Sequence, residues 1–415
     1  MEVRAMRTAV LRITQKEFAE ILGYTEAVVR KWEKRGATIT LVRQFAAAMD
    51  TVYERLDARQ LARFEVALAE VGGSADRQFA SVLTESFESP TTIANRMQRL
   101  SELDAEDGVL DVLSLAIDDI VDRYEVEGPL RLAPEAIAVR DRAEALLREL
   151  RHPAQSHRLY LIAGRLSGVL AYMAVNRGKF AHAKMYCREA FAIASLLNDR
   201  ELQAWVRGTE SFCAYYQGDF QDSVRLAREG IDLSSAGPQS IRLYSNGLAR
   251  ALGKLGDTHG VSEAIESAMA IASTHKTGPW LTPALTFAPY GEARLMANAA
   301  TAYLSAGGYR RTLDYGHQVD QLVNESDSVW SRSLVKLDVA AALLHQRRPD
   351  VEQSVQLGVE ALAASRDRPI RSVWQRAHEL GAIMGPVPGK APNDYLDSLR
   401  EWAITARDFA AADDH

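Results

Sequence analysis

The sequence predicts an all-α protein, with a small N-terminal helical domain followed by a long array of paired helices. Residues 14–36 carry the start and stop signals of two short helices, and small residues recur at fixed distances from five later turns. The composition, 47% hydrophobic and 25% charged, is ordinary for a globular chain. We therefore expect an N-terminal domain over residues 1–70, a hinge and helical connector over 71–130, and a repeat domain over 131–415.

Residues 14–36 read TQKEFAEILGYTEAVVRKWEKRG and predict two helices joined by a tight turn. Thr14 can cap the first helix, and Glu17 can reach back to the backbone N–H of Thr14, which completes a capping box. Gly23 suits the left-handed residue that ends a helix, and Thr25 can cap the second one. The side chains expected to pack between the two helices are Phe18, Ala19, Leu22, Val29 and Trp32.

Helical spacing continues on both sides of this pair. A short amphipathic helix before it would use Val3, Met6, Val10 and Ile13. A longer helix after it would use Leu41, Phe45, Ala48, Met49, Val52 and Leu56. The sequence VGGSA at residues 71–75 reads as a hinge. Residues 77–130 look helical, with breaks near Ser89-Pro90 and Gly128-Pro129, and we give them no role beyond that of a connector.

The paired-helix stretch resembles the Cro and phage-repressor (Xre-type) family. The matching residues are Thr14, Gln15, Phe18, Ala19, Gly23, Thr25, Val29, Trp32, Glu33 and Gly36. In that family the second helix enters the DNA major groove, so the resemblance implies a helix-turn-helix that binds double-stranded DNA. The alternative is a hairpin with a purely structural role.

The resemblance also implies which side chains meet DNA. Lys31 can donate to guanine O6 and N7, Glu26 can accept from cytosine N4, and Ala27 can touch a thymine methyl group. Gln15 lies at a helix N-terminus, which suits a phosphate. The full expected DNA-binding set is Gln15, Thr25, Glu26, Ala27, Arg30, Lys31, Lys34, Arg35 and Arg43, of which Arg30, Lys34, Arg35 and Arg43 are expected to neutralise phosphates.

Two features limit what this head can read alone. Relatives more often carry a polar or basic residue where Ala27 stands, so the operator sequence does not follow from the resemblance. A single head makes few base contacts, so useful specificity needs two heads on a two-fold operator. We therefore expect a homodimer; the alternative is a monomer that binds weakly.

Charge is divided unevenly along the chain. Residues 1–43 carry nine Lys and Arg and five acids, a charge of +4, while the whole chain is −6, which leaves −10 for residues 44–415. A basic head on an acidic body suits nucleic-acid contact by the head alone, because the body would repel phosphate.

Five turns anchor the repeat: Gly178, Gly218, Gly256, Gly307 and Pro349. A small residue stands seven positions before each anchor, and three further sets stand two, five and twelve positions after the anchors. In anchor order these sets are Ala171, Ser211, Ala249, Ala300 and Ala342; Phe180, Phe220, Thr258, Tyr309 and Val351; Ala183, Ser223, Val261, Thr312 and Ser354; and Ala190, Gly230, Ala268, Val319 and Ala361.

This pattern resembles the tetratricopeptide repeat, in which helix pairs stack into a solenoid with a concave face. The spacings between anchors are 40, 38, 51 and 42 residues, against ~34 for the standard repeat. The fourth unit therefore carries an insertion, HKTGPWLTPALTFAPYG at residues 275–291. A generic α-solenoid is the alternative and gives the same stacked pairs.

The first helix of each pair would line the groove. Counting from the anchors gives the expected ligand-binding set: Arg165, Tyr172, Asn176, Trp205, Phe212, Tyr215, Tyr216, Asn246, Arg250 and Lys254, with Arg294, Thr301, Lys336 and Arg347 from later units. Aromatic residues beside cations suit an extended peptide or an anionic small molecule. The alternatives are a protein partner, or no ligand and a dimerisation role.

Other chemistry is not indicated. Residues 247–255, GLARALGKL, have one spacer residue too many for a phosphate loop. The nine histidines show no metal-ligand spacing, so we expect no enzyme, no metal and no cofactor. Cys187 and Cys213 are too few for a disulfide framework, and the chain has no run of eighteen apolar residues and no signal peptide, so we expect a reduced, cytoplasmic setting without a membrane.

The order of the two parts resembles an actinobacterial family that joins an Xre-type head to tetratricopeptide-like repeats, the NsdA-type negative regulators of differentiation and antibiotic formation. WEKRGATIT, RLYSNGLARALGKLGD and LVKLDVAAALLHQRRPDVEQS carry this resemblance. The layout is also similar to the peptide-sensing regulators of Gram-positive bacteria. It implies a transcriptional regulator, or repressor, whose repeat domain binds a small-molecule or peptide signal. The alternative is a protein-interaction scaffold with a vestigial head.

Overall fold

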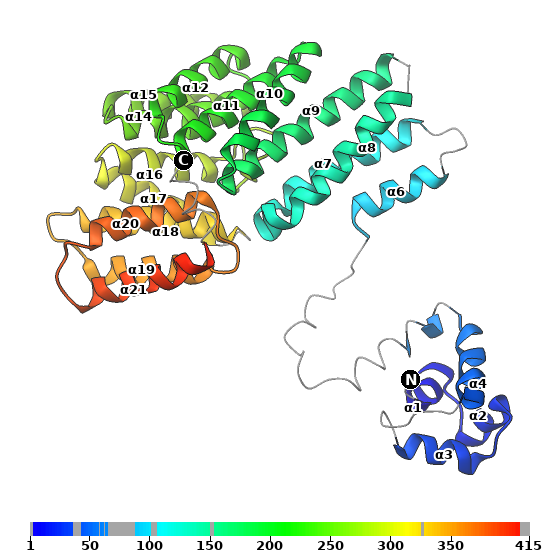
Figure 1. Ribbon diagram of the computed structural model, residues 1–415. Helices are drawn as coiled ribbons and strands as arrows, with labels where there is room; N and C mark the ends of the chain where they lie inside the picture. Colours follow the sequence, from blue (N-terminus) through cyan, green and yellow to red (C-terminus); the bar gives the residue numbers. More distant parts are fainter. Residues whose placement is uncertain are drawn as a thin grey trace. The chain divides into compact units, whose positions relative to one another are not determined.

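The computed structural model describes residues 3–35, 43–57, 59–61, 63–64, 88–100, 106–149, 153–324 and 328–406. Every regular element among these residues is a helix, so the described chain is all-α, as the sequence predicts (Figure 1). Two compact units form: Met1–Phe87, here called the head, and Glu88–His415, here called the body.

Five helical elements with defined bounds lie among the described residues of the head, and residues 59–61 and 63–64 are helical as well. The five elements are α1 (Val3–Ala5), the π-helical η1 (Met6–Leu11), α2 (Gln15–Leu22), α3 (Glu26–Arg35) and α4 (Arg43–Glu54). The short helix expected before the pair is present, and α4 is the longer helix expected after it. Leu41, Gly36 and the hinge at 71–75 lie outside the described residues, as do the side chains of Arg35, Arg43 and Phe45.

Local signals set the geometry of α2 and α3. The Thr14 hydroxyl accepts from the backbone N–H of Glu17 at 3.2 Å, and the Glu17 carboxylate accepts from the backbone N–H of Thr14 at 2.7 Å, so the capping box is confirmed. Gly23 ends α2 at φ 75°, the left-handed conformation expected of it. The five side chains expected between the helices, together with Met49 from α4, are all buried. The helix pair is therefore held at a defined crossing.

The described part of the predicted connector belongs to the body. The helices α6 (Pro90–Leu100), α7 (Glu106–Glu127) and α8 (Pro129–Glu149) follow one another, and α7 packs on α6, α8 and α9. The two predicted breaks fall at helix boundaries, with Gly128 at φ 85° between α7 and α8. The described residues of the predicted connector from 88 onward therefore lie in the same compact unit as the helix pairs that follow, and α7 and α8 form a packed pair.

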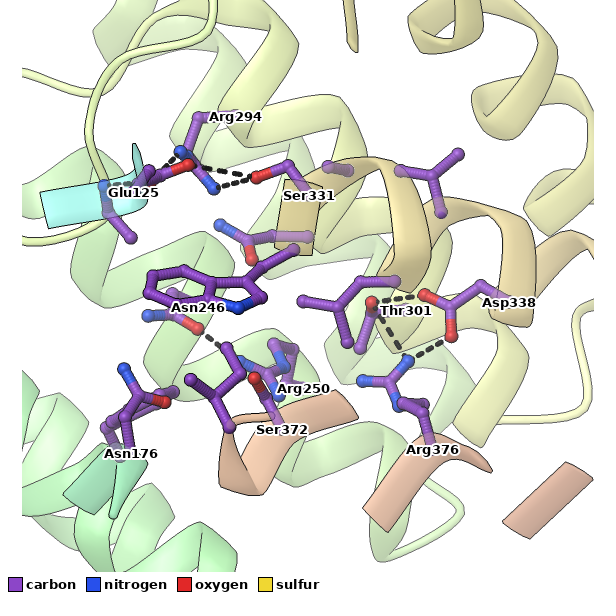
Figure 2. A pocket seen from close by; sticks show the side chains of 18 of the residues that line it. Glu125, Asn176, Asn246, Arg250, Arg294, Thr301, Ser331, Asp338, Ser372 and Arg376 are labelled. Carbon is purple, nitrogen blue, oxygen red and sulfur yellow. Dashed lines mark hydrogen bonds and ion pairs between the residues drawn. The ribbon is translucent and has the colours of Figure 1, made fainter. Parts of the chain in front are cut away.

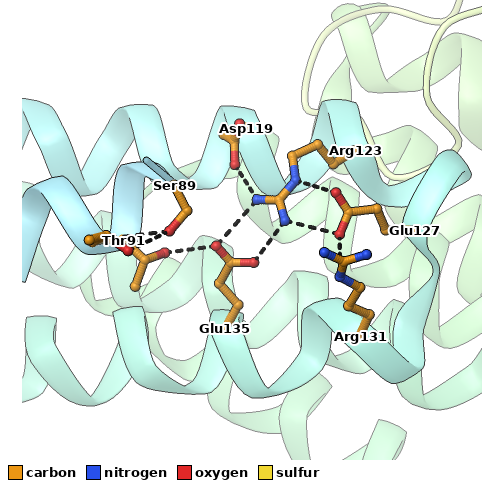
Figure 3. A network of polar contacts seen from close by, with 8 residues as sticks. Ser89, Thr91, Asp119, Arg123, Glu127, Arg131 and Glu135 are labelled. Atoms are coloured by element: carbon orange, nitrogen blue, oxygen red, sulfur yellow. Dashed lines mark hydrogen bonds and ion pairs between the residues drawn. The ribbon is translucent and has the colours of Figure 1, made fainter. Parts of the chain in front are cut away.

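A network of charges fastens α6 to this pair (Figure 3). The Arg123 guanidinium on α7 donates to Asp119 at 2.6 Å and to Glu127 at 2.7 Å on its own helix, and to Glu135 on α8 at 3.2 Å. The hydroxyl of Thr91 on α6 donates to the same Glu135 at 3.0 Å. The first described helix of the body is therefore tied to α7 through one shared carboxylate.

The rest of the body is a succession of helix pairs. They comprise α9 (Pro153–Asn176) with α10 (Phe180–Leu196), α11 (Arg200–Tyr216) with α12 (Phe220–Ser234), α13 (Pro238–Arg242), η4 (Leu243–Ala249) and α14 (Arg250–Lys254) with α15 (Thr258–His275), α16 (Glu292–Ser305) with α17 (Tyr309–Asn324), α18 (Val329–Leu344) with α19 (Val351–Ala364), and α20 (Arg371–Met384) with α21 (Lys390–Thr405).

The anchors and small residues occupy the places expected of them. Each of the four anchor glycines lies between the helices of a pair with φ between 67° and 82°, a conformation that glycine adopts without strain. The residues two after the five anchors each begin the second helix of a pair. The small residues seven before, five after and twelve after the anchors are all buried. Helix axes can approach to about 8–10 Å only where side chains are slight.

The succession curves until distant helices meet. The first helix of each pair lies on the inside, and α7 packs against α18 while α20 packs against α9. Residues 277–291, within the predicted insertion, form a non-helical segment between α15 and α16. Its carbonyl oxygens accept from inner helices: Thr286 from the Trp205 indole at 2.9 Å, and Phe287 from the Gln239 amide at 2.7 Å. The insertion is thus built into the inside of the body.

One helix among the described residues, α9, has the length and hydropathy of a membrane span. In its most apolar window of 18 residues, 78% of the residues are buried inside the body. The core position of α9 accounts for its apolar composition.

A substitution at Gly253 tests how closely the inner helices α14 and α16 approach each other. A Cβ added there would lie 2.4 Å from the carbonyl oxygen of Ala302 on α16, so Gly253→Ala must push α14 and α16 apart. We expect it to destabilise the body by about 1–3 kcal/mol. Gly108→Ala is the control, because the nearest atom, the Met97 methyl, is 3.5 Å away, and a helical glycine replaced by alanine gains about 0.5–1 kcal/mol. Thermal unfolding followed by circular dichroism compares them, and equal midpoints would contradict the packing.

Candidate nucleic-acid surface and ligand cavity

One face of α3 is exposed and carries three cations. Ala27, Arg30, Lys31 and Lys34 are all exposed, and their spacing of three, one and three residues places them on a single face. Val29 and Trp32, which are buried, lie on the opposite face. We call the four exposed residues the α3 strip. Its cations are presented outward because the apolar face is held by the core of the head.

Glu26 does not stand on this strip. Its carboxylate accepts from the Arg30 guanidinium at 2.6 Å, one helical turn on, in an exposed ion pair. Such pairs are worth only about 0.3–0.5 kcal/mol, so a phosphate can replace the carboxylate as the partner of Arg30. Lys31 and Lys34 form no ion pair with the described residues, which leaves both ammonium groups available to an anion.

Gln15 is engaged inside the head. Its side-chain amide donates to Glu33 at 2.6 Å, and the Arg7 guanidinium donates to the same carboxylate at 2.5 and 3.1 Å. Burial raises the pKa of Glu33, but the bonds from Arg7 and Gln15 outweigh it and hold that pKa below its usual value. The side chain of Gln15 is therefore occupied within the head, and only its backbone N–H, at the first residue of α2, remains of the phosphate contact expected at this residue.

Thr25 is exposed directly before α3, and its carbonyl oxygen accepts from the backbone N–H groups of Val28 at 3.0 Å and Val29 at 3.3 Å. It therefore starts the helix. The other two expected DNA contacts, Arg35 and Arg43, have side chains outside the described residues.

The inner helices of the body enclose a cavity of about 70 Å³. Figure 2 shows most of its lining side chains. The lining residues come from α7, α9, α11, η4, α14, the insertion, α16, α18 and the start of α20. Six of the ten residues in the expected ligand-binding set line it, together with two of the four from later units: Tyr172, Asn176, Phe212, Tyr216, Asn246, Arg250, Arg294 and Thr301. The residues six before the four glycine anchors all face this cavity.

Two buried ion pairs form part of the lining. Arg294 on α16 pairs with Glu125 on α7, and Arg376 on α20 pairs with Asp338 on α18. Thr301 donates to Asp338 at 2.5 Å and accepts from Arg376 at 3.2 Å. Removing one partner of such a pair leaves an uncompensated buried charge, at a cost of about 3–5 kcal/mol. These pairs therefore hold helices from distant parts of the sequence around the cavity.

Glu125 links the most elements. Its Oε1 accepts from the backbone N–H of Ala284 in the insertion at 2.7 Å and from Arg294, and its Oε2 accepts from the Ser331 hydroxyl on α18 at 3.3 Å. A single carboxylate on α7 thus joins the insertion, α16 and α18.

Arg250 is the third buried guanidinium of the lining, and its partners differ. It donates to the Asn246 side-chain oxygen and to the Tyr216 hydroxyl, the latter at 2.8 Å, and its carbon lies 4.5 Å from the ring centroid of Tyr215. All of these partners are neutral. Its Nε lies buried without a hydrogen bond.

Aromatic rings form the wall beside Arg250. Tyr172 and Phe212 stack with ring centroids 4.8 Å apart, and Tyr124 meets Tyr172 edge-on at 6.0 Å. The Asn176 amide donates to the Tyr124 hydroxyl at 2.7 Å. Burial raises the pKa values of Tyr124 and Tyr172 well above the usual range, so both rings stay neutral.

Four residues of the expected set do not line the cavity. Trp205 is fully buried against Phe287 of the insertion, and the Arg165 guanidinium lies over the same Phe287 ring. Tyr215 packs behind Arg250, and Lys254 pairs with Glu379 at 2.5 Å. Of the later units, Lys336 pairs with Glu360, and Arg347 lies at a separate surface pocket. Trp205 and Arg165 are therefore occupied by the insertion, and Lys254 and Lys336 are occupied by ion pairs.

The sequence patterns missed several lining residues. Tyr124 and Glu125 lie in the predicted connector, and Tyr290 lies in the insertion. Asp338 is not among the counted positions. The loop after α18, residues 345–350, is longer than the turns between the two helices of earlier pairs, so Pro349 does not mark the end of α18 as the glycine anchors mark the ends of earlier helices. Gly128 lies between α7 and α8 with a positive φ, as the glycine anchors do between the helices of their pairs. This glycine is the sequence signal that could have identified α7 and α8 as a further pair.

Cys187 and Cys213 are both buried, and burial raises the pKa of each thiol, that of Cys213 to about 12. Both behave as small apolar side chains. Among the described residues there is no group of three or more His, Cys, Asp or Glu that could hold a metal ion. No family model matches this chain, and a search of the curated proteins found no significant match.

The buried carboxylate of Glu33 predicts an acid-sensitive head. Because its folded pKa is lowered, the stability it provides is present above its ordinary pKa of 4.5 and is lost as the pH falls through the folded value. Glu33→Gln should weaken the head at neutral pH by about 1–2 kcal/mol and remove this step. Hydrogen exchange of peptides within residues 15–35 in the full chain, corrected for intrinsic rates, measures it. The exposed Glu20→Gln is the control; identical acid profiles for both variants would refute the assignment.

Proposed function

We propose that this chain is a sequence-specific, DNA-binding transcriptional regulator. In this account the head is a helix-turn-helix domain, the body is a tetratricopeptide-like solenoid, and a small-molecule or peptide signal in the cavity modulates operator binding. The observation that carries the proposal is the α3 strip: Arg30, Lys31 and Lys34 stand on the exposed face, opposite the buried Val29 and Trp32. A helix whose apolar face packs on the domain core and whose exposed face carries cations is suited to the DNA major groove.

The strip divides into two expected roles. Ala27 lies in the first turn of α3 and Lys31 lies one turn further on. We expect them to read base edges, a thymine methyl group and guanine O6 and N7 respectively. Arg30 and Lys34 are expected to neutralise phosphates, with Arg35 and Arg43 added on sequence grounds. One oxygen of the Glu26 carboxylate is bonded to Arg30, which leaves the other to accept from cytosine N4.

The body supports the second half of the proposal. Small residues at fixed distances from the anchors lie where paired helices cross, which is the packing logic of tetratricopeptide repeats. Tyr124 and Glu125 bring α7 to the cavity, while the neighbouring Arg123 holds the network that reaches α6. A ligand that prefers one arrangement of α7 can therefore bias α6, the first described helix after the head in the sequence.

Further aspects rest on the sequence alone. A two-fold operator requires two heads, so we propose a homodimer. The charge of −10 on residues 44–415 should keep the acidic remainder of the chain away from DNA. Regulation of secondary metabolism or development rests on the family resemblance. We also propose that the protein is cytoplasmic, is not an enzyme and uses no cofactor.

The second candidate is a protein-interaction scaffold whose head has little DNA specificity. One observation favours it: an apolar groove beside α8, lined by Leu130, Ile137, Met173 and Tyr186, in which Leu130 is 72% exposed. An apolar groove of this kind can receive a partner helix.

Selection of source-genome fragments by the purified chain, followed by sequencing, separates the two candidates. We expect enrichment of a two-fold sequence, which then serves as the probe. Lys31→Ala should cost about 1–3 kcal/mol on the enriched sequence and little on random DNA. Lys34→Ala should weaken binding to the enriched sequence and to random DNA equally. It should also reduce the steepness of log K against log[salt] by about 0.9.

Lys390→Ala, an exposed cation at the start of α21, is the matched control and should change neither affinity nor slope. No enriched sequence, or an enriched sequence bound equally well by the Lys31 variant, would count against the regulator and in favour of the scaffold.

A further inference from the structure

The charges that line the cavity do not balance. Glu125 and Asp338 are each paired with an arginine, Arg294 and Arg376 respectively. Arg250 bonds only to neutral groups, so the five charged residues of the lining leave one positive charge unmatched. A buried guanidinium without an anion is costly, which makes an anion the natural complement of this cavity.

We propose that the signal held by the body carries a single carboxylate group, which binds Arg250. This deepens the function proposed above, because it assigns a chemical class to the ligand of the same cavity. A guanidinium carries five N–H donors, and Arg250 spends two of them on Asn246 and Tyr216. Three N–H donors remain, and a planar carboxylate can accept two parallel bonds from one edge of a guanidinium.

A second unsatisfied atom defines what else the ligand carries. The side-chain oxygen of Asn176 is buried without a hydrogen bond, while its amide nitrogen is fixed by Tyr124. Asn176 is 3% exposed and also lines the cavity. A buried acceptor of this kind calls for a donor, so the ligand should present an N–H or O–H group besides its carboxylate.

Size and charge narrow the class further. A cavity of about 70 Å³ holds a group of only a few heavy atoms, far less than the ~300–1,000 Å³ of a drug-sized site. The occupant is a small free acid, or the carboxylate end of a longer chain that extends out of the cavity. A dianion such as phosphate would need a second unpaired cation, and Arg294 and Arg376 are already neutralised by their carboxylates.

Titration of the full chain, followed by ligand-observed NMR, tests the proposal with small probes. Glycolate has a carboxylate and a hydroxyl donor, and glycolamide has the same shape without the charge. We expect saturable binding of glycolate in the millimolar range and at least tenfold weaker binding of glycolamide. Triglycine and triglycine amide form the second arm: binding of triglycine that exceeds both its amide and glycolate identifies a peptide end rather than a free acid.

Two substitutions of lining arginines provide the structural controls. Arg250→Met should lower glycolate affinity at least tenfold yet keep or raise the melting temperature, because it removes an unmatched buried charge. Arg376→Met should lower the melting temperature by several degrees, because it leaves Asp338 unpaired. Arg347→Met, at the separate surface pocket, should change neither.

The outcomes separate this inference from the proposed function. Three outcomes would overturn the anion assignment even if the head binds a specific DNA sequence. They are equal binding of glycolate and glycolamide, no binding of any of the four probes, and unchanged glycolate affinity in Arg250→Met. A marked fall in stability on Arg250→Met would also overturn it, because Arg250 would then be matched inside the protein. Carboxylate binding that depends on Arg250 supports the assignment even if no DNA sequence is enriched.

Discussion

The close crossing of paired helices is the constraint on which the body depends. Where the first and second helices of a pair meet, the contact residues are Ala, Ser, Gly, Thr or Val, and each is buried. Larger side chains would hold the axes apart and open the curve of the stack. Because the curve is tight, α7 reaches α18 and α20 reaches α9, and the inner faces of distant pairs line one cavity.

That closure has an electrostatic consequence. Side chains far apart in the sequence are brought into a space with little water, where charges must be paired or neutralised. Two ion pairs provide this pairing, Glu125 with Arg294 and Asp338 with Arg376. They join helices on different sides of the cavity and thereby fix which helices face one another. Arg250 does not meet it, and the imbalance turns a packing arrangement into a candidate recognition site.

The head shows how far local sequence signals determine geometry. Thr14, Glu17 and Gly23 act within a few residues of one another, so the capping box and the end of α2 could be predicted from spacing alone. The glycine anchors are local in the same way, and the residues counted six positions before them face the cavity. Contacts between distant residues could not be predicted: Gln15 with Glu33, or Glu125 with Arg294, depend on how the helices stack. The insertion was found by spacing, but nothing in its sequence indicated that Thr286 would receive the Trp205 indole.

The central claim is that the α3 strip lies against DNA. Lysine acetylation of the full chain, with and without the enriched DNA and read by mass spectrometry, measures this residue by residue. Lys31 and Lys34 should react markedly more slowly in the complex, while Lys184 and Lys390, exposed on α10 and α21, should react at unchanged rates. If Lys31 and Lys34 react at the same rate in the presence of bound DNA, the account is contradicted.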